Sequence, residues 1–554
     1  MRFNLGQDIL PHEYKGEIYN RESAVRLSWV RLGFALFFVV FVARTLQLGL
    51  QSNDVGKNLG NGGDVERRAD IVDRNGVVLA KSVKAANIKL FPPRVKDKDI
   101  DAVANVIHDV APNDYTFEDA LRLVRSGKRG IYVKMNASED QAKYIDSVNR
   151  KYDCFESEKF WRRLYPQRNV FAHVVGFAGK DSGLEGVEYI YDEYLRENRD
   201  ALKLSIDSRV QNIFHEKLTF AMEKYRAKGA LGMLMNSSTG EMIAMVQLPD
   251  FDPSDYNSSS VGVRKFRLLR DNFEMGSVFK IFNTAMAYEN GLQNKNYKID
   301  EPLVIHDKFG RPIKHKPIDD VSSFKRDVVK KMGKHTLKAP EIMLHSCNVG
   351  SARIALDFPD GTQKEFFHRL HFDKALQLEF GKTERGLTHK FWGPAEKATA
   401  SFGHGITVTP MHVLLAVNAM TNGGIYIYPT LLKRNIGAIR GERVLNPEIS
   451  SYLRNIMFHI AEETTARKAR VKGIEIGGKT GTAEKRHTDG TTDKKRNTTV
   501  FTGIFPVSAP QYIILIMLDE PQGTVESGGW KTAAHNAVPT AGAILDDIIP
   551  LLFE

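Results

Sequence analysis

Apolar and polar residues alternate in several short segments of the chain, and this period of two predicts β-strands. Residues 67–82 (RRADIVDRNGVVLAKS) alternate on both sides of an Asn-Gly pair, which is typical of a hairpin turn. Residues 229–249 (GALGMLMNSSTGEMIAMVQLP) predict two apolar strands around a Ser-Thr-Gly turn, and residues 498–507 and 511–521 predict two more near the end of the chain.

Helical periodicity lies between and after these strands. Asp207 is a candidate N-cap for an amphipathic helix within residues 203–225, and residues 538–553 (VPTAGAILDDIIPLLF) predict a last amphipathic helix. Strands at both ends of residues 200–554, with helices between and after them, favour one α/β (α+β) domain. We expect its antiparallel sheet to be closed by the N-terminal and C-terminal strands.

One apolar run stands apart from these patterns. Residues 32–43 (LGFALFFVVFVA) are too short to span a membrane, but residues 28–50 supply the length of about 20 that a span requires. A buried helix or a cleaved signal peptide is the alternative, but no small-x-small cleavage site follows. More Lys and Arg precede the run than follow it, which favours an internal amino terminus. We therefore predict a cytoplasmic tail (1–27), an uncleaved single-pass anchor (28–50) and an external remainder.

Composition and charge indicate which classes of partner and metal site suit this chain. With 42% hydrophobic and 26% charged residues the chain is typical of a globular protein, and its net charge of +11 is scattered along the sequence. That scatter favours an anionic membrane or polymer surface over nucleic acid. The two cysteines, Cys154 and Cys347, lack zinc-site spacing, so we expect two free buried thiols. The 16 histidines show no metal-ligand pairing, so we expect core or surface roles for them.

A serine and a lysine three residues apart begin an apolar segment. Ser277 and Lys280 lie in FEMGSVFKIFNTAMAYENG, and on a helix they share one face. A serine becomes a good nucleophile when a neighbouring base takes its proton, and a desolvated lysine can act as that base. The chain has a second copy of the spacing, Ser322 and Lys325, in the charged segment DDVSSFKRDVVKK. We expect that copy to be a solvated helix face, so Ser277 is the candidate nucleophile.

Two further motifs follow in order along the chain. Ser346-Cys347-Asn348 can deliver a hydroxyl and an amide into a cleft, and Lys479-Thr480-Gly481-Thr482 can present a cation and two hydroxyls on a strand. Gly481 would let a substrate approach the backbone. Each motif is weak alone, whereas Ser-x-x-Lys, Ser-x-Asn and Lys-Thr-Gly in this order form the set of β-lactamases and penicillin-binding proteins.

Other readings of these residues are less favoured. Residues 473–480 satisfy the P-loop pattern Gly-x4-Gly-Lys-Thr, but a P-loop requires an apolar strand before it and a helix after it. The flanking sequence is charged upstream and begins with glycine downstream. The chain contains no Gly-x-Ser-x-Gly sequence, which disfavours an α/β-hydrolase.

At these motifs the chain resembles a class B penicillin-binding protein, and the resemblance runs from the anchor to the C-terminus. RRADIVDRNGVVLA and RRLYPQRNVFAHVVGFAGKDSGLEGVE resemble the pedestal blocks of the family, with Ala69 where glycine is usual. LSIDSRVQ, SSTGEMIAMVQLPDFDP, FGHGITVTPMHVLLA and LDEP resemble its transpeptidase domain. His404 and His412 replace the commoner glutamine or tyrosine at expected cleft-edge positions, and the segment around Trp530 is longer than usual. The resemblance implies a dimerisation-like pedestal over 51–199 and a transpeptidase domain over 200–554.

The implied reaction is D,D-transpeptidation of peptidoglycan stem peptides ending in D-Ala-D-Ala, with β-lactam antibiotics as mimics. Ser277 would be acylated, Lys280 would be the base and Ser346 would relay a proton. Asn348 would hold the donor peptide, Lys479 would supply positive charge, and Thr480 and Thr482 would bind its carboxylate. The resemblance implies no metal and no organic cofactor. The implied location is the bacterial inner membrane, with the catalytic domain in the periplasm.

The short tail, the compact pedestal and LDEP most resemble the division-specific subtype, whose expected partners are a polytopic glycan-chain polymerase and other division proteins. The elongation-specific subtype is the nearest alternative. A β-lactamase and a non-enzymatic penicillin sensor also share the motifs. A β-lactamase rarely needs an anchor and a pedestal, and retention of all three motifs disfavours a sensor.

Overall fold

A computed structural model of the chain describes residues 67–307, 309–313, 315–387, 391–434, 441–486 and 492–553. The predicted tail (1–27) and anchor (28–50) lie outside the described residues. None of the helices in the described part of the chain is both long and apolar enough to cross a membrane. The described chain forms two compact units, one of residues 85–160 and one of residues 67–84 with 161–553.

The larger unit is built on a five-stranded antiparallel sheet in the order β16-β17-β18-β8-β9. The first strands of the predicted domain thus pair with the last, which confirms the predicted sheet. The central strand β18 is buried over nearly its whole length, so both faces of the sheet are covered. The five strands are β8 (Gly229–Asn236), β9 (Met242–Leu248), β16 (Gly477–Arg486), β17 (Thr492–Phe505) and β18 (Tyr512–Asp519).

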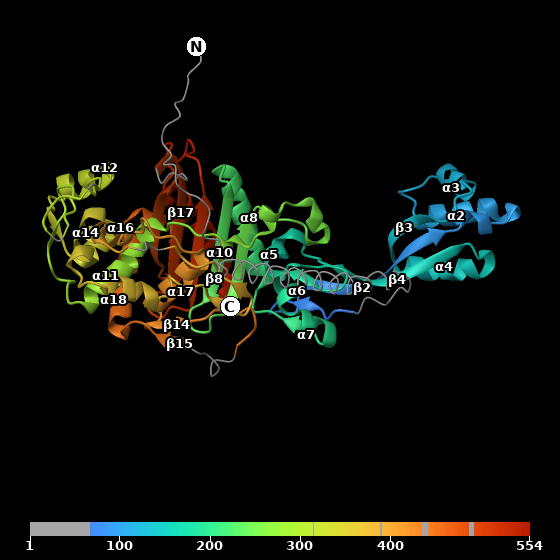
Figure 1. The fold of residues 1–554 in the computed structure, drawn as a ribbon, viewed down its shortest axis with the longest axis horizontal. Helices are drawn as coiled ribbons and strands as arrows, with labels where there is room; N and C mark the ends of the chain where they lie inside the picture. The colour runs from blue at the N-terminus through green and yellow to red at the C-terminus, as the bar shows by residue number, and fades with distance from the viewer. Residues whose placement is uncertain are drawn as a thin grey trace, which may run out of the picture. The chain divides into compact units, whose positions relative to one another are not determined.

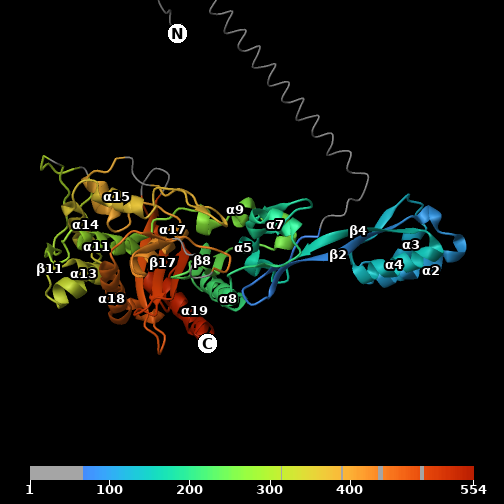
Figure 2. The ribbon, with the colours of Figure 1, turned by 90° about the horizontal axis from the view of Figure 1, so that it is seen from below.

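Helices cover this sheet on both sides (Figure 1). The helices α8 (Ser208–Lys224) and α19 (Ala537–Leu552) lie side by side against strands β8, β9, β17 and β18 (Figure 2). Asp207 caps α8 by accepting a hydrogen bond from Arg209 N at 3.0 Å, as predicted. The helix α17 (Pro410–Thr421) packs on β17 and β18, and every one of its residues is buried.

A cluster of helices carries the first two motifs. The buried helix α11 (Lys280–Glu289) contacts α13, α14, α17 and α18. It follows the short 3₁₀-helix η5 (Gly276–Phe279), which packs directly against β16. The other helices of this cluster are α13 (Ala339–Leu344), α14 (Asn348–Asp357), α15 (Thr362–Arg369), α16 (Pro394–Ala400) and α18 (Pro447–Glu463).

The two segments that resemble the family's pedestal, residues 67–80 and 162–188, form short strands and helices of the larger unit. The predicted hairpin at Asn75-Gly76 is confirmed, since β1 (Ile71–Val72) pairs antiparallel with β2 (Val78–Leu90). The strand β7 (Leu202–Lys203) pairs parallel with β1. Nearby elements are β5 (Phe177–Ala178), β6 (Gly183–Glu185), α5 (Ala172–Val175), α6 (Gly186–Ile190) and α7 (Asp192–Glu197).

A buried ion-pair network ties the two blocks together. Glu188 is fully buried, and its carboxylate accepts hydrogen bonds from Arg68 Nε at 2.9 Å and Arg163 Nε at 2.6 Å. Arg163 also donates to the carbonyl of Ala69 at 2.8 Å. Removing one member would leave buried charge without its partner, which typically costs about 3–5 kcal/mol.

The smaller unit has its own apolar core. A three-stranded arrangement of β2, β3 (Ile131–Ser138) and β4 (Phe155–Leu164) packs with three helices (Figure 1). The core includes Ile88, Val103, Ile107 and the free thiol of Cys154. The helices are α2 (Ile100–Val110), α3 (Phe117–Val124) and α4 (Glu139–Tyr152).

Candidate active site

Ser277 lies where η5 passes into α11, so its hydroxyl is at the N-terminal end of a buried helix. The neighbouring residues Gly276 and Val278 are buried, while Ser277 itself is half-buried. Gly276 has φ +52°, and a Cβ there would lie 2.6 Å from the carbonyl oxygen of Thr482. Only glycine fits this close approach, which brings the turn that holds Ser277 against the strand of the third motif.

Lys280 is the centre of the site. Its Nζ lies 2.7 Å from Ser277 Oγ, 2.7 Å from Asn348 Oδ1 and 3.4 Å from Ser346 Oγ. The side chain is fully buried. The sequence predicts only that the Ser-x-x-Lys and Ser-x-Asn motifs share a cleft. In the structure their side chains are in direct contact.

The second motif forms the turn between α13 and α14. Ser346 has φ +59°, a left-handed conformation that is unfavourable for a residue with a side chain. Backbone strain of this kind occurs mainly at functional sites, where surrounding contacts hold the strained residue in place. Asn348 begins α14, and its amide oxygen faces Lys280.

The third motif lies on β16, the edge strand of the main sheet. Lys479 is 1% exposed, and its Nζ lies 3.1 Å from Ser346 Oγ and 3.2 Å from the carbonyl oxygen of Thr480. Ser346 is thus a bridge between the two lysines. Thr480 and Thr482 are half-buried, two residues apart on the strand.

Two other segments of the chain contact Gly481 and Thr482, one before Ser277 and one before α19. The hydroxyl of Thr482 accepts a hydrogen bond from Ala533 N at 3.1 Å, so its proton remains available for a further acceptor. A Cβ on Gly481 would lie 2.2 Å from the carbonyl oxygen of Met275, so a larger residue would separate β16 from the segment before Ser277.

Burial dominates the electrostatics of the two lysines. It lowers the pKa of Lys280 to about 8, against smaller opposing contributions from Asp320 and Cys347. Burial and then the charge of Lys280 hold the pKa of Lys479 well below its usual range. The site therefore favours a state in which at least one of the two amines is neutral near physiological pH.

Sequence reasoning did not identify Asp320. Its carboxylate, also buried, accepts hydrogen bonds from Asn348 N at 2.5 Å and Val349 N at 3.3 Å, at the first turn of α14. It also accepts from Cys347 Sγ at 3.1 Å. A carboxylate at a helix N-terminus satisfies free N–H groups and complements the helix dipole. Asp320 therefore fixes the turn that carries Ser346 and Asn348.

The second Ser-x-x-Lys copy is exposed, as expected. Ser322 lies at the surface in α12 (Ser322–Phe324), before a π-helical turn over Lys325–Lys331. Lys325 Nζ lies 2.7 Å from the carboxylate of the half-exposed Asp319. The P-loop alternative is wrong, because Lys479 and Thr480 lie within a strand and are not followed by a helix.

The two histidines expected at the cleft edge differ in position. His404 is part-exposed, and its Nε2 lies 4.0 Å from the carboxylate of Glu274, three residues before Ser277. His412 is fully buried, with Nδ1 2.8 Å from Thr409 Oγ1 and Nε2 3.0 Å from the carbonyl of Lys374. Burial lowers the pKa of His412 to about 4. His412 is thus a neutral core residue and not a cleft-edge contact.

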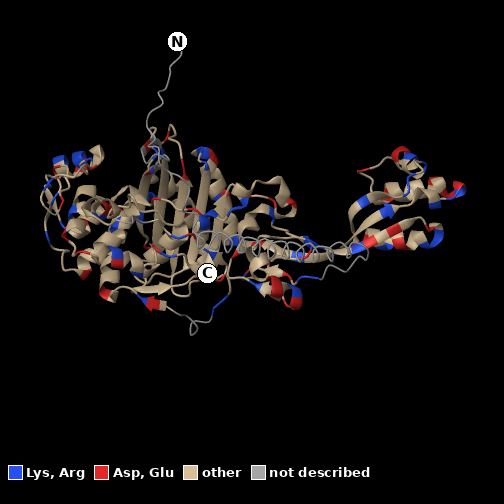
Figure 3. Ribbon diagram, in the orientation of Figure 1, with Lys and Arg blue, Asp and Glu red and all other residues tan. Residues whose placement is uncertain are grey.

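Other candidate chemistry is limited in the part of the chain that the structure describes. Both cysteines are buried and free, which confirms the expectation for Cys154 and Cys347. No cluster of three or more potential metal ligands occurs among the described residues. Lys and Arg are distributed among Asp and Glu over the described helices and strands (Figure 3).

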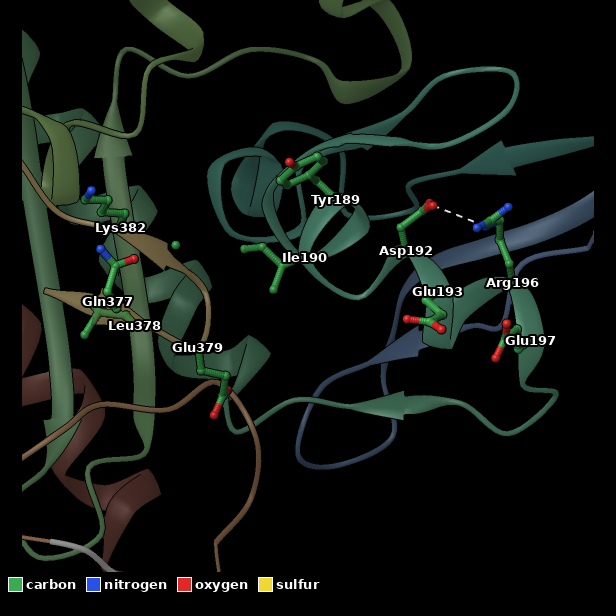
Figure 4. Close-up of a pocket in the computed structure, with 11 residues that line it drawn as sticks. Tyr189, Ile190, Asp192, Glu193, Arg196, Glu197, Gln377, Leu378, Glu379 and Lys382 are labelled. Carbon is green, nitrogen blue, oxygen red and sulfur yellow. Dashed lines mark ion pairs between the residues drawn. The ribbon is translucent and has the colours of Figure 1, made fainter.

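A pocket of about 650 Å³ lies elsewhere in the larger unit (Figure 4). One wall is formed by α6 and α7, where Arg196 pairs with Asp192 at 3.2 Å, and the other by the hairpin of β12 (Gln377–Leu378) and β13 (Gly381–Lys382). Its walls carry both signs of charge and no residue of the three motifs. Its chemistry offers no nucleophile paired with a base.

Comparisons with known families agree with this geometry. Residues 230–546 match the family described as penicillin binding protein transpeptidase domain. Residues 65–217 match the penicillin-binding protein dimerisation domain. Among solved structures, penicillin binding protein 2X from Streptococcus thermophilus superposes with a TM-score of 0.72 at 19% identity, covering 88% of this chain and 80% of that one. At that identity the likeness concerns the fold.

Curated relatives extend over almost the whole chain. A probable peptidoglycan D,D-transpeptidase FtsI from Caulobacter vibrioides is 29% identical over 553 residues, covering 94% of this chain and 88% of the relative. The stage V sporulation protein D of Bacillus subtilis is 29% identical over 533 residues, covering 88% and 78%. The peptidoglycan D,D-transpeptidase FtsI of Escherichia coli is 28% identical over 520 residues, covering 87% and 83%.

Proposed function

This chain belongs to the penicillin-binding protein transpeptidase family, and from that membership and the geometry of its site we propose that it cross-links peptidoglycan stem peptides through an acyl-enzyme at Ser277. The observation that carries the proposal is the contact between Ser277 Oγ and Nζ of Lys280, at 2.7 Å. A neutral, buried amine at that distance is a competent general base for a serine hydroxyl.

Acylation begins with attack of Ser277 Oγ on the carbonyl carbon of the penultimate D-Ala. Lys280 takes the hydroxyl proton as the new ester bond forms. The bond to the terminal D-Ala then breaks as Ser346 passes its proton to the leaving amine and takes the proton held by Lys280, which becomes neutral again. Ser346 suits this role because its Oγ lies within 3.4 Å of Lys280 Nζ and 3.1 Å of Lys479 Nζ.

The substrate itself sets the protonation of the lysines. Its terminal carboxylate, bound by Thr480 and Thr482, places a negative charge beside Lys479 and favours the charged form of that amine. Positive charge on Lys479 in turn disfavours positive charge on Lys280. Binding of a carboxylate thus leaves Lys280 neutral, in the state that can accept the proton of Ser277.

Charge on the tetrahedral intermediate is stabilised by backbone N–H groups. Ser277 N and Thr482 N are the proposed oxyanion-hole donors, each contributing about 3–4 kcal/mol. The close approach of Gly276 to Thr482 supports this pairing, since it brings the two backbone segments together. Asn348 binds the donor peptide through its side-chain amide, oriented by Asp320 behind it.

The acyl group is then transferred from Ser277 Oγ to an amine of a neighbouring stem peptide, or to water in a carboxypeptidase side reaction. The ester bond breaks in this step, and Ser277 recovers a proton. β-Lactams acylate Ser277 because their ring amide mimics D-Ala-D-Ala. A fluorescent penicillin tests this on a gel. Labelling is expected for the wild type and for Ser322→Ala, and it is expected to vanish for Ser277→Ala. Persistent labelling of Ser277→Ala would overturn the assignment of the nucleophile.

The cellular role that we propose is septal wall synthesis at the inner membrane, with residues 28–50 as the anchor and the remainder in the periplasm. Relatives named FtsI over most of the chain support the division subtype. A polytopic glycan-chain polymerase is the proposed partner. Depletion should give filaments with unconstricted septa, whereas round, swollen cells would instead indicate the elongation subtype.

A further inference from the structure

A tryptophan side chain is exposed on a loop that contacts the strand of the Lys-Thr-Gly motif. Trp530 is 62% exposed, and it lies between β18 and α19. Three residues later, Ala533 N donates to the hydroxyl of Thr482 at 3.1 Å. The amide of Asn497, on the neighbouring strand β17, donates to the carbonyl of Lys531 at 2.9 Å. Trp530 is therefore anchored next to the proposed site of the substrate carboxylate.

The loop is organised by its own hydrogen bonds. Thr524 N donates to Ser527 Oγ at 2.8 Å, and Ser527 N donates to Thr524 Oγ1 at 3.1 Å. Gly529 N closes the turn by donating to the carbonyl of Thr524 at 2.9 Å. A Cβ on Gly523 would lie 2.2 Å from the carbonyl oxygen of Gly529, so the two ends of the turn are in close contact. These contacts hold the backbone turn that immediately precedes Trp530.

A second aromatic ring lies beside the indole and nearly parallel to it. His535 stacks on Trp530 with 6.2 Å between ring centroids and an interplanar angle of 18°. Nδ1 of His535 lies 2.8 Å from Thr532 Oγ1, which holds the imidazole in that orientation. The indole remains 62% exposed beside this ring, so most of its surface is open to solvent.

We propose that Trp530 is a stacking platform for a pyranose ring of the glycan that carries the donor stem peptide. A single exposed aromatic residue is ordinary on a protein surface. This one is large, flat and uncharged, and such a ring binds a flat apolar surface with little loss of conformational entropy. The C–H face of a sugar ring is such a surface.

The ligand class follows from the chemistry of the site and rests on the proposed function. A donor peptide bound at Thr480 and Thr482 can extend along the free edge of β16, because an edge strand accepts an added strand. Its other end is joined to the glycan. The loop bearing Trp530 also lies beside β16 beyond the carboxylate site, because Asn497, which donates to Lys531, pairs with Glu484 of that strand. A peptide that runs along the edge from Thr480 toward Glu484 leads toward this loop.

Competition against fluorescent penicillin on the full-length protein tests the proposal. The competitors are N-acetylglucosaminyl-N-acetylmuramyl pentapeptide and the same pentapeptide without sugars. For the wild type, we expect half-inhibition of labelling at a concentration about 3- to 10-fold lower for the glycosylated competitor, the range typical of one aromatic stacking contact. In Trp530→Ala this ratio should fall to about one.

Three variants serve as controls. Trp530→Phe keeps a smaller ring and should keep part of the ratio, and His535→Ala removes the neighbouring ring and should lower it. Tyr189→Ala removes an aromatic side chain of matched exposure, 63%, in the pocket of Figure 4, and should leave the ratio unchanged.

Two results of the competition experiment would contradict the proposed role of Trp530. One is a wild-type ratio of one, and the other is a ratio that survives Trp530→Ala. An equal weakening of both competitors and of penicillin labelling in Trp530→Ala would also overturn it, since the residue would then shape the acyl site itself. Failure of the wild type to bind penicillin at all would instead contradict the proposed function.

Discussion

Two segments of this protein carry a serine and a lysine at the same spacing, and two adjacent aspartates serve them differently. Lys280 is fully buried beside Ser277, and Asp320 lies behind it at the start of α14. Lys325 follows the exposed Ser322 and pairs with Asp319 at the surface. The spacing is therefore not the source of reactivity. Burial of the amine, and its contacts with Ser346 and Asn348, distinguish the first segment from the second.

The largest expected difference between the segments concerns the base. Arginine keeps a positive charge but cannot be deprotonated in a protein. Lys280→Arg should therefore reduce the second-order rate of penicillin acylation by about 10²–10⁴-fold. The matched substitution Lys325→Arg should leave the rate unchanged. Thermal melting of both variants checks that they fold, and a mild effect at Lys280 would mean that another group is the base.

The pH dependence of acylation should reflect the buried lysine. Because burial lowers the pKa of Lys280 to about 8, its neutral form increases as pH rises through that value and is lost as pH falls. The acylation rate should rise by about 50-fold between pH 6 and pH 8, following the fraction of neutral amine. A stopped-flow profile measures this. A rate that is flat over the range, or that falls with rising pH, would contradict a neutral Lys280.

The second lysine of the site should tolerate arginine better. Lys479 is proposed to act through its charge and through its hydrogen bonds to Ser346 and Thr480, and arginine retains the charge while changing the geometry. Lys479→Arg should lose about tenfold in acylation rate, comparable to one hydrogen bond to a charged group. Equal losses at Lys280 and Lys479 would show that the two roles are not distinct.

The smallest effect is expected from the two aspartates. Asp320→Asn should lower the acylation rate several-fold at saturating pH and reduce stability by about 0.5–2 kcal/mol, because α14 loses its charged cap. It should also move the pH profile to lower pH, since the Asp320 carboxylate raises the pKa of Lys280. Asp319→Asn should change neither quantity. The same pair of measurements, rate against pH and melting temperature, compares the two variants.

Local signals were sufficient for much of the fold. The Asn-Gly hairpin, the Asp207 cap, the alternating strands and the last helix each depend on a few neighbouring residues, and all are found in the structure. Closure of the sheet could also be predicted, because apolar strands at the two ends of one domain tend to pair. The anchor over 28–50 remains a prediction.

Contacts between segments that are distant in the sequence could not be predicted from local sequence signals. Asp320 reaches α14 from a separate segment, and nothing in its local sequence distinguishes it from Asp319. The close approach of Gly276 to Thr482 joins segments about 200 residues apart. His412 lies in an apolar helix that becomes wholly buried, so its resemblance-based position at the cleft edge was wrong. These features arise from packing, which leaves no periodic signal in the sequence.

Mapping of the penicillin adduct on the wild-type protein tests the central claim most directly. Ser277 and Ser322 fall in different tryptic peptides, residues 271–280 and 315–325, so mass spectrometry separates the two segments in one experiment. The account predicts the penicilloyl mass on the peptide 271–280, at Ser277, and none on the other. An adduct on Ser322, or on Ser346 in place of Ser277, would contradict it.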